Sequence, residues 1–358
     1  MAKRLRSGFT TGSCSAAAAK AATVAIITGE APESIEIGFP DASRKSFAVH
    51  SCTINSKKAT ASIIKDAGDD PDVTNKAEIC ATVELGHKKN PKSPCVIHEN
   101  IQLFRGKGVG IVTKPGLAIS VGEPAINPIP RQMIYQSIQE VTRQPLSVTI
   151  LVTNGERLAE KTLNKRLGIL GGLSILGTTG IVRPISADAW TATISASMDV
   201  AKEAGLQDIV ISTGRTSEKG AQHILELPEE AYAEMGDFLH FSLSEARKRG
   251  FATVHYAGMW AKVMKAALKI PQTHVKNGAL EVAAGAKLLE SLGARPPLLD
   301  LLQKSNTARE MLTHIEAAGQ TELIIKVCNK AKEYAEEVAE TKVHIYLIDH
   351  KTKVIAHV

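Results

Sequence analysis

The change of sequence pattern near Leu146 limits the fold more than any other feature of this 358-residue chain. From there on, short apolar runs rich in β-branched residues alternate with helical patterns. Such runs are typical of buried parallel strands, and their alternation with helices predicts a doubly wound, Rossmann-like α/β domain. The predicted strands are 147–153, 208–213, 252–257 and 342–348, and the predicted helices are 187–204, 216–225, 237–249, 259–268, 278–292 and 321–340.

The N-terminal part of the sequence has a different pattern, which predicts an α+β domain. Residues 13–28 are rich in alanine, the strongest helix former, with Thr11 or Ser13 placed as the N-cap and Gly29 placed to end the helix. Short segments rich in Ile, Val, Thr and Ala fill residues 34–86 and predict a small antiparallel sheet.

A further helix is expected to begin at Pro128 or Pro130, because proline fits the first turn of a helix and not its interior. We place the domain boundary near residue 145, where the pattern changes. The two predicted domains are therefore 1–145, with an α+β fold, and 146–358, with an α/β fold.

The chain carries a net positive charge, with 43 Lys and Arg against 37 Asp and Glu, which gives +6 at pH 7. This charge favours an anionic partner. Nucleic acid is not expected, because aromatic residues make up only 4% of the chain and no basic segment is interleaved with them. The sequence predicts a small polyanion as the partner.

No segment predicts a membrane anchor. The longest uncharged stretch, 167–182, is shorter than the roughly 20 apolar residues of a transmembrane helix, and it contains several glycines. The five cysteines are irregularly spaced, which fits a reducing compartment better than a disulfide framework. We therefore expect a cytoplasmic protein without a membrane partner.

The segment 166–184 is the most informative for function. Its glycines, with Thr178 and Thr179 between them, leave backbone N–H groups accessible and allow positive φ angles, so a phosphate or nucleoside could bind there. The spacing of Gly172 and Gly177 resembles a P-loop, but Thr178 stands where that motif requires lysine, which argues against ATP hydrolysis. The alternative is a tight connection in which the glycines serve packing alone.

A second candidate turn follows the predicted strand 208–213. In an open α/β sheet, ligands bind beyond the carboxyl ends of the strands. We therefore expect Thr213, Gly214, Arg215 and Ser217 to line one crevice together with the 171–180 turn. The alternative is that the hydroxyl residues of this turn only cap the following helix.

In the N-terminal half, residues 105–117 contain three alternating glycines with Lys107 and Lys114 nearby. This arrangement predicts an anion-binding turn at a sheet edge, with an ordinary glycine-rich hairpin as the alternative. The next loop brings Glu123 and Arg131 together around several prolines, and rigid loops of this kind are often functional.

Metal binding and cysteine chemistry are not expected. The one local group of metal-ligand types has a single tightly spaced pair, and its members are Cys80, His87, Cys95 and His98. Cys14 lies at a predicted helix N-terminus, where a thiolate would be favoured. A small buried residue in an alanine-rich helix is the better interpretation of Cys14.

Three of these segments together resemble one protein family. They are SGFTTGSCSAAAAKAA at the start, GKGVGIVTKPGL followed by VGEPAINPIPRQMI, and LNKRLGILGGLSILGTTGIVRPIS. In this order they resemble the cobalt-precorrin-5B C-1-methyltransferases, the CbiD family of anaerobic cobalamin biosynthesis, over nearly the whole chain. The resemblance implies transfer of a methyl group from S-adenosylmethionine to C-1 of cobalt-precorrin-5B, which gives cobalt-precorrin-6A.

The resemblance also gives the candidate residues expected roles. It implies a tetrapyrrole with several carboxylates as substrate of the N-terminal domain, and S-adenosylmethionine as cofactor of the α/β domain. Glu123 is the candidate acceptor of the proton lost from the ring. The expected cofactor-binding residues are Gly171, Gly172, Gly177, Thr178, Thr179, Gly180, Thr213 and Gly214, and the expected substrate-binding residues are Thr10, Thr11, Gly12, Lys107, Lys114, Arg131 and Arg215.

The glycine turns are also compatible with a competing function. A nucleotide-dependent small-molecule kinase or hydrolase would use the same turns and would respond to ATP and Mg²⁺. The sequence does not decide the strand order of the α/β sheet or whether the chain forms a homo-oligomer.

Overall fold

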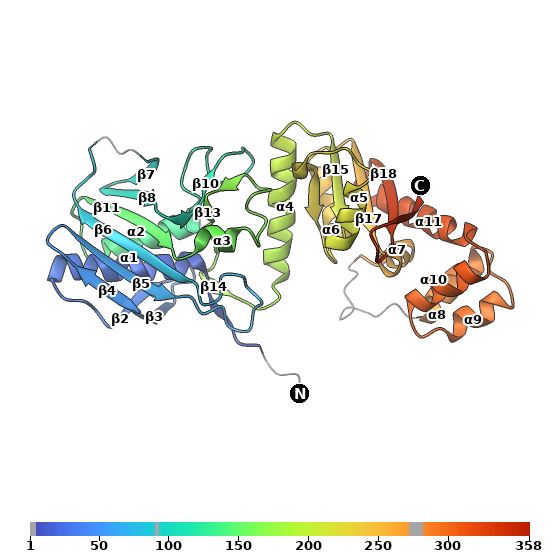
Figure 1. Ribbon diagram of the computed structural model, residues 1–358, viewed down its shortest axis with the longest axis horizontal. Helices are drawn as coiled ribbons and strands as arrows, with labels where there is room; N and C mark the ends of the chain where they lie inside the picture. Colours follow the sequence, from blue (N-terminus) through green and yellow to red (C-terminus); the bar gives the residue numbers. More distant parts are fainter. Residues whose placement is uncertain (1–4, 90–92, 272–281) are drawn as a thin grey trace. The chain divides into compact units, whose positions relative to one another are not determined.

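The chain folds into two compact units, Met1–Ser186 and Ala187–Val358, called unit 1 and unit 2 below (Figure 1). The computed structural model describes residues 5–89, 93–271 and 282–358. Both units contain helices and strands, so the fold is mixed α/β.

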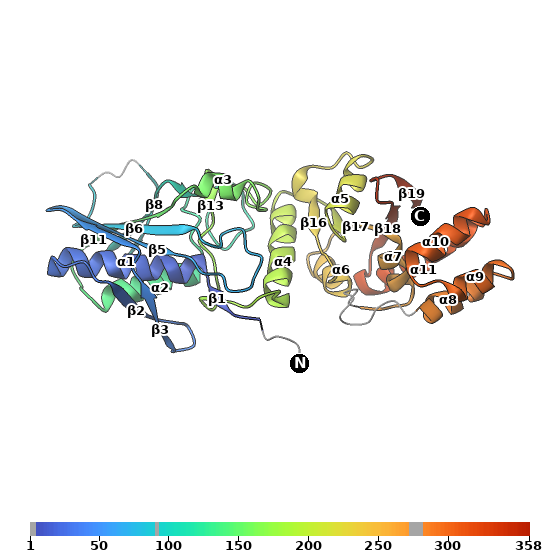
Figure 2. The ribbon, with the colours of Figure 1, turned by 60° about the horizontal axis from the view of Figure 1, so that its bottom comes forward.

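Unit 1 is built on helix α1 (Thr11–Thr28), which lies along one face of a six-stranded sheet (Figure 2). Its alanines have no side-chain atoms beyond Cβ, so α1 packs closely on the sheet and on helix α2 (Pro128–Gln139). The Thr10 hydroxyl accepts a hydrogen bond from the Ser13 N–H and caps α1, and Gly29 ends it in a left-handed conformation. The predicted helix is confirmed, but its N-cap is Thr10 and not Thr11 or Ser13.

The sheet of unit 1 is larger than predicted, and it is mixed. Neighbouring strands are antiparallel except for β11 and β8, which are parallel. Across the sheet the order is β4 (Ser51–Ile54), β5 (Lys58–Ile64), β6 (Glu78–Leu85), β11 (Leu146–Val152), β8 (Ile101–Arg105) and β7 (Cys95–His98). The antiparallel pairing predicted for residues 34–86 is confirmed, but β11, β8 and β7 enlarge the sheet and make it mixed.

Unit 1 also contains pairs of short strands outside the six-stranded sheet. The short helix α3 (Gly155–Ala159) contacts one of these pairs, β9 and β13. Every such pair is antiparallel except β9 and β13, which are parallel. The pairs are β2 (Ser34–Gly38) with β3 (Arg44–Ala48), β1 (Gly8–Phe9) with β14 (Ile181–Val182), β9 (Gly108–Val109) with β13 (Gly172–Leu173), and β10 (Ile111–Val112) with β12 (Ile169–Leu170).

Strand β11 corrects the predicted domain boundary. The sequence pattern assigns this apolar run to the C-terminal domain, but β11 lies between β6 and β8 in the sheet of unit 1. A strand that is buried on both faces has the same continuous apolar pattern in either sheet, so its sequence does not reveal its partners. The boundary lies after Ser186 and not near residue 145.

Unit 2 contains a five-stranded sheet in which the first four strands are parallel and β19 is antiparallel to β18. The order is β16 (Tyr232–Glu234), β15 (Asp208–Ser212), β17 (Thr253–Gly258), β18 (Lys342–Ile348) and β19 (Val354–His357). The helices are α4 (Ala187–Glu203), α5 (Arg215–Gln222), α6 (Leu239–Lys248), α7 (Trp260–Ala267), α8 (Val282–Ser291), α9 (Leu298–Lys304), α10 (Ala308–Ala317) and α11 (Glu322–Ala339), with a short 3₁₀ turn at Glu229–Ala231.

The predicted alternation of strands and helices in unit 2 is confirmed, with shifts of a few residues at the element ends. Strands β16 and β19 and helices α9 and α10 were not predicted. Residues 278–281 of the predicted helix 278–292 lie outside the described residues. Within the described residues, no helix combines the length and apolar character that spanning a bilayer requires.

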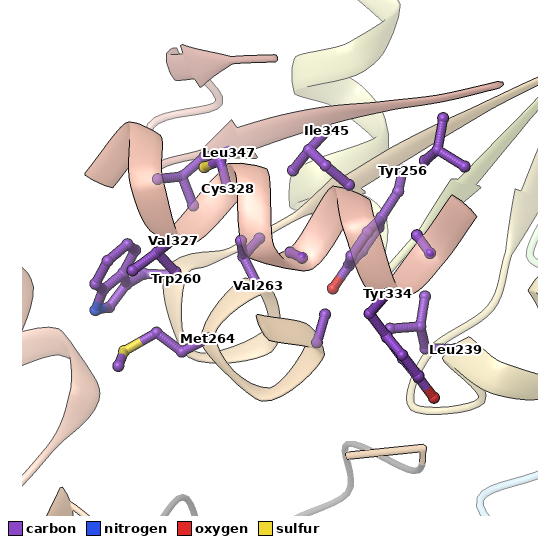
Figure 3. Packing of buried hydrophobic residues seen from close by; sticks show 14 of the residues in the cluster. Leu239, Tyr256, Trp260, Val263, Met264, Val327, Cys328, Tyr334, Ile345 and Leu347 are labelled. Carbon is purple, nitrogen blue, oxygen red and sulfur yellow. The ribbon is translucent and has the colours of Figure 1, made fainter. Parts of the chain in front are cut away.

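An apolar core holds unit 2 together (Figure 3). On one face of the sheet, Tyr256, Ile345 and Leu347 pack with residues of α7 and α11, among them Trp260 and Val327. On the opposite face, α5 packs over β15, β17 and β18. Because β16, β15, β17 and β18 are parallel, their carboxyl ends lie at one edge of the sheet.

We expect Leu347→Ala to destabilise unit 2 by about 2–5 kcal/mol, because it leaves a cavity in a fully buried part of the core. The control is Ile325→Ala on α11, whose side chain is partly exposed. Urea unfolding of both variants, followed by circular dichroism, checks the difference. Equal losses in the two variants would contradict this description of the core.

Candidate functional site

The glycine-rich segments 105–117 and 166–184, which we predicted as separate sites, lie side by side in unit 1. Strand β9 pairs with β13, and β10 pairs with β12. The proline-containing loop joins them, because the Asn127 N–H donates to the Ile175 carbonyl at 2.9 Å and the Ile175 N–H donates to the Ala125 carbonyl at 2.8 Å. We call the segments 106–113, 123–127 and 168–177 together the glycine junction.

The start of α1 is hydrogen-bonded to the glycine junction. The Thr11 hydroxyl accepts from the Leu176 N–H at 2.9 Å and donates to the Leu176 carbonyl at 3.3 Å. The Gly12 N–H donates to the same carbonyl at 3.0 Å, and the Thr10 N–H donates to the Gly180 carbonyl at 3.0 Å. Thr10, Thr11 and Gly12 are buried and hold the loop that follows β13.

The glycines of the 171–180 turn fill places where a side chain would collide with other atoms. A Cβ on Gly172 would overlap the backbone of β9. On Gly177 it would lie 2.6 Å from the Thr10 side chain, and on Gly180 it would lie 2.6 Å from the Phe39 ring. These contacts support the packing interpretation for the three glycines. Thr178 and Thr179 are exposed at the tip of the turn.

The exposed side chains of this region are partly apolar and partly basic. Val121, Leu170 and Leu176 each keep roughly half of their surface exposed. They lie on adjoining segments, since Leu170 pairs with Ile111 and the Gly122 N–H donates to Val112. Lys107 is exposed, and Lys114 packs its side-chain carbons against Gly168 and is half-buried.

Glu123 and Arg131 form an ion pair, with the Arg131 Nη2 atom 2.8 Å from Glu123 Oε2. The same guanidinium donates from Nε to the Ile126 carbonyl at 2.6 Å and from Nη2 to the Pro124 carbonyl at 3.3 Å. The structure therefore brings the two predicted residues together, and Arg131 braces the loop that carries Glu123.

Tyr135 lies one helical turn after Arg131 on α2, and sequence reasoning did not identify it. Its ring stacks on His98 with centroids 4.4 Å apart, and its buried hydroxyl has no hydrogen-bond partner within the described part of the chain. Burial raises the pKa of Tyr135 to about 12. The four-residue spacing from Arg131 is the signal that places both residues on one helix face.

In unit 2, Thr213 and Gly214 form the turn between β15 and α5. The Thr213 N–H donates to the Ala257 carbonyl at 3.1 Å, and the Thr213 hydroxyl lies 3.1 Å from the Ser217 hydroxyl. Gly214 is the N-cap of α5, with a φ of 154° and no side-chain cap. Arg215, the first residue of α5, is exposed.

The 171–180 turn and the turn at Thr213 and Gly214, which we expect to line one crevice, lie in different units. The 171–180 turn belongs to unit 1, where it packs on α1 and β9, whereas Thr213 and Gly214 belong to unit 2. The reason is the position of β11, which keeps the chain in unit 1 for about forty residues beyond the predicted boundary. The expectation that the two turns line one crevice stays a prediction.

Two of the cysteine thiols are buried, which disfavours their thiolate form. Cys14 is buried in α1, and burial raises the pKa of its thiol to about 12. Burial also raises the pKa of Cys328 to about 12. Among residues 5–89, 93–271 and 282–358, no three His, Cys, Asp or Glu side chains are grouped so that they could hold a metal ion.

The fold and the site define a mixed α/β protein whose first unit exposes apolar and basic side chains on a glycine-rich scaffold, and whose second unit carries a glycine turn at the end of a parallel strand. The sequence matches the CbiD family model over residues 1–184 and the model of the CbiD C-terminal domain over residues 272–358. The chain belongs to the CbiD family. The first match ends close to the boundary of unit 1.

Relatives of known name cover nearly the whole chain. A cobalt-precorrin-5B C(1)-methyltransferase from Desulfotalea psychrophila is 59% identical over 98% of this chain and 97% of its own length. A relative of the same name from Geobacter metallireducens is 44% identical over 94% of each chain. Among solved structures, a cobalamin biosynthesis protein (cbiD) from Archaeoglobus fulgidus is 23% identical, with a TM-score of 0.40, over 88% of this chain and 85% of that one.

We expect Gly172→Ala to destabilise unit 1 by about 3 kcal/mol or more, because the new Cβ would collide with the backbone of β9 at a positive φ. The matched control is Gly171→Ala, which also has a positive φ but would meet only the Arg105 guanidinium, at 3.2 Å. That change should cost about 1–2 kcal/mol. Urea unfolding measures both, and equal losses would contradict the role of Gly172 in packing.

Proposed function

We propose that this chain transfers a methyl group from S-adenosylmethionine to C-1 of cobalt-precorrin-5B, giving cobalt-precorrin-6A in cobalamin biosynthesis. The observation that carries the proposal is the 59% identity, over 98% of the chain, to a relative named for this reaction. The structure adds two candidate sites whose chemistry fits the two reactants. The competing kinase or hydrolase function is not favoured by the relatives.

Unit 1 is the proposed substrate-binding unit. A tetrapyrrole has an apolar macrocycle with carboxylates around its edge, and the glycine junction exposes apolar side chains with Lys107 and Lys114 on nearby segments. Ion pairs with carboxylates are stronger than neutral hydrogen bonds, so these lysines suit the edge of such a ring. Thr178 and Thr179 add exposed hydroxyls. Arg131 contributes by holding its loop in place.

Unit 2 is the proposed cofactor-binding unit. Its parallel strands β16, β15, β17 and β18 have the order 2-1-3-4 along the chain, which is typical of doubly wound domains with a reversal point between β15 and β17. Ligands of such domains bind beyond the carboxyl ends of the strands at that point. Thr213 and Gly214 lie there, beside Ala257 of β17.

The residues at this turn leave space for the cofactor. A Cβ on Gly214 would have one near neighbour, a Glu234 carboxylate oxygen at 4.0 Å, apart from its own chain neighbours and within the described residues. S-adenosylmethionine, when bound, supplies an electrophilic methyl group. Thr213 and Gly214 would hold it, and Arg215 is an exposed cation on the same turn.

The chain's own contribution to catalysis is chiefly alignment. Displacement at a methyl carbon needs little acid–base assistance, and holding two reactants in line contributes up to roughly 7–11 kcal/mol. One proton must leave the ring, and we propose Glu123 as its acceptor. Oε2 of Glu123 is held by Arg131, whereas Oε1 makes no hydrogen bond with other described residues.

Calorimetric titration with S-adenosylhomocysteine tests the cofactor assignment first. We expect stoichiometric, micromolar binding, followed by methylation of cobalt-precorrin-5B in an anaerobic assay with mass detection of the product. Turnover of ATP with Mg²⁺ in the absence of methylation would support the competing function instead.

We expect Lys107→Ala to raise the KM for the tetrapyrrole about tenfold with little change in kcat, because it removes a charge that binds substrate and transition state equally. The control is Lys57→Ala on the exposed turn between β4 and β5. Steady-state kinetics at fixed ionic strength check the difference. An unchanged KM for Lys107→Ala would remove this lysine from the substrate site.

A further inference from the structure

We propose that unit 2 carries an adenosine subsite beyond the carboxyl end of β16, where Glu234 binds the ribose hydroxyls and Trp190 stacks on the adenine. The inference rests on the proposed function, because it assigns the adenosyl half of the proposed cofactor. It adds two residues that the sequence analysis did not identify.

The first observation is the position of Glu234 at the end of β16. Glu234 pairs with Ser212, the last residue of β15, so it lies beside the start of the Thr213–Gly214 turn. The position of a Cβ on Gly214 is 4.0 Å from Oε1 of Glu234 and has no other near neighbour beyond its own chain neighbours in the described residues. The carboxylate therefore borders an open space above the turn.

The chemistry of a carboxylate selects the ligand. Its oxygens accept hydrogen bonds, so it can bind the neighbouring 2′ and 3′ hydroxyls of a ribose. Glu234 lies 20 residues after Gly214, and in dinucleotide-binding domains an acidic residue about 20 residues after the glycine turn binds the ribose 2′-hydroxyl. The adenosyl group of the proposed cofactor carries such a ribose.

The second observation is Trp190 of α4, which lies next to the residues that follow β16. Its Nε1–H donates to the Met235 carbonyl at 3.0 Å. A Cβ on Gly236 would lie 2.9 Å from its ring, so the absence of a side chain at Gly236 lets the ring lie there. Trp190 is nevertheless 42% exposed, whereas Trp260 is 4% exposed. A fixed, exposed aromatic ring against the residues that directly follow Glu234 is a suitable stacking surface for adenine.

Calorimetry tests the role of Glu234. We expect Glu234→Gln to weaken binding of S-adenosylhomocysteine roughly 10- to 100-fold, the range for loss of a hydrogen bond to a charged group. The control Glu226→Gln removes the same charge from an exposed position of the loop after α5, and it should bind as the unaltered chain does. Thermal unfolding checks that both variants are folded.

A ligand analogue tests the same contact without any substitution. S-2′-deoxyadenosylhomocysteine should bind the unaltered chain about tenfold more weakly than S-adenosylhomocysteine. The two ligands should bind Glu234→Gln with similar affinity, because the partner of the 2′-hydroxyl has been weakened. If the analogue still binds Glu234→Gln about tenfold more weakly than S-adenosylhomocysteine does, the assignment of Glu234 is overturned.

Fluorescence tests the role of Trp190. The Trp260→Phe variant keeps Trp190 as the single tryptophan of the chain. We expect S-adenosylhomocysteine to quench its emission with the affinity measured by calorimetry. Binding without any change in emission would overturn the stacking on Trp190.

The outcomes separate this inference from the proposed function. If the unaltered chain does not bind S-adenosylhomocysteine, the cofactor assignment and the subsite both fail. If it binds and Glu234→Gln binds equally well, the subsite fails and the methyltransferase function stands.

Discussion

The structure of unit 1 depends on a contact between backbones at Gly108. A side chain at Gly108 would overlap the Val152 carbonyl at the end of β11, and side chains at Gly155 or Gly172 would overlap Gly108 itself. The Gly108 N–H also donates to the Glu156 carboxylate at 3.0 Å. These contacts fix β9, β13 and the start of α3 to the end of β11. The position of the glycine junction is therefore set by the six-stranded sheet.

This arrangement gives structural contacts to several residues of the segments that resemble the family. Thr10, Thr11 and Gly12 use their hydrogen-bonding groups on the loop from Leu176 to Gly180, and the glycines permit the close packing. The residues left for binding are the side chains that this scaffold exposes. A rigid scaffold is what an alignment-based methyl transfer requires, because small displacements of the reactants raise the barrier steeply.

The sequence predicts the elements of this fold better than their arrangement. The helix of residues 13–28 and the strand 342–348 have strong patterns, and both are present. Strand β16 is only three residues long, and β19 is a short edge strand, so neither shows a clear alternation of apolar and polar residues. The partners of β11 could not be predicted, since its apolar run fits the centre of either sheet.

The candidate sites were predictable in part for a similar reason. Glycine spacing marks a turn, but only the structure shows whether the missing Cβ leaves open space, as at Gly214, or makes room for another backbone, as at Gly172. The spacing of 20 residues between Gly214 and Glu234 is readable in the sequence, but only the register of Glu234 with Ser212 shows that it lies beside the turn.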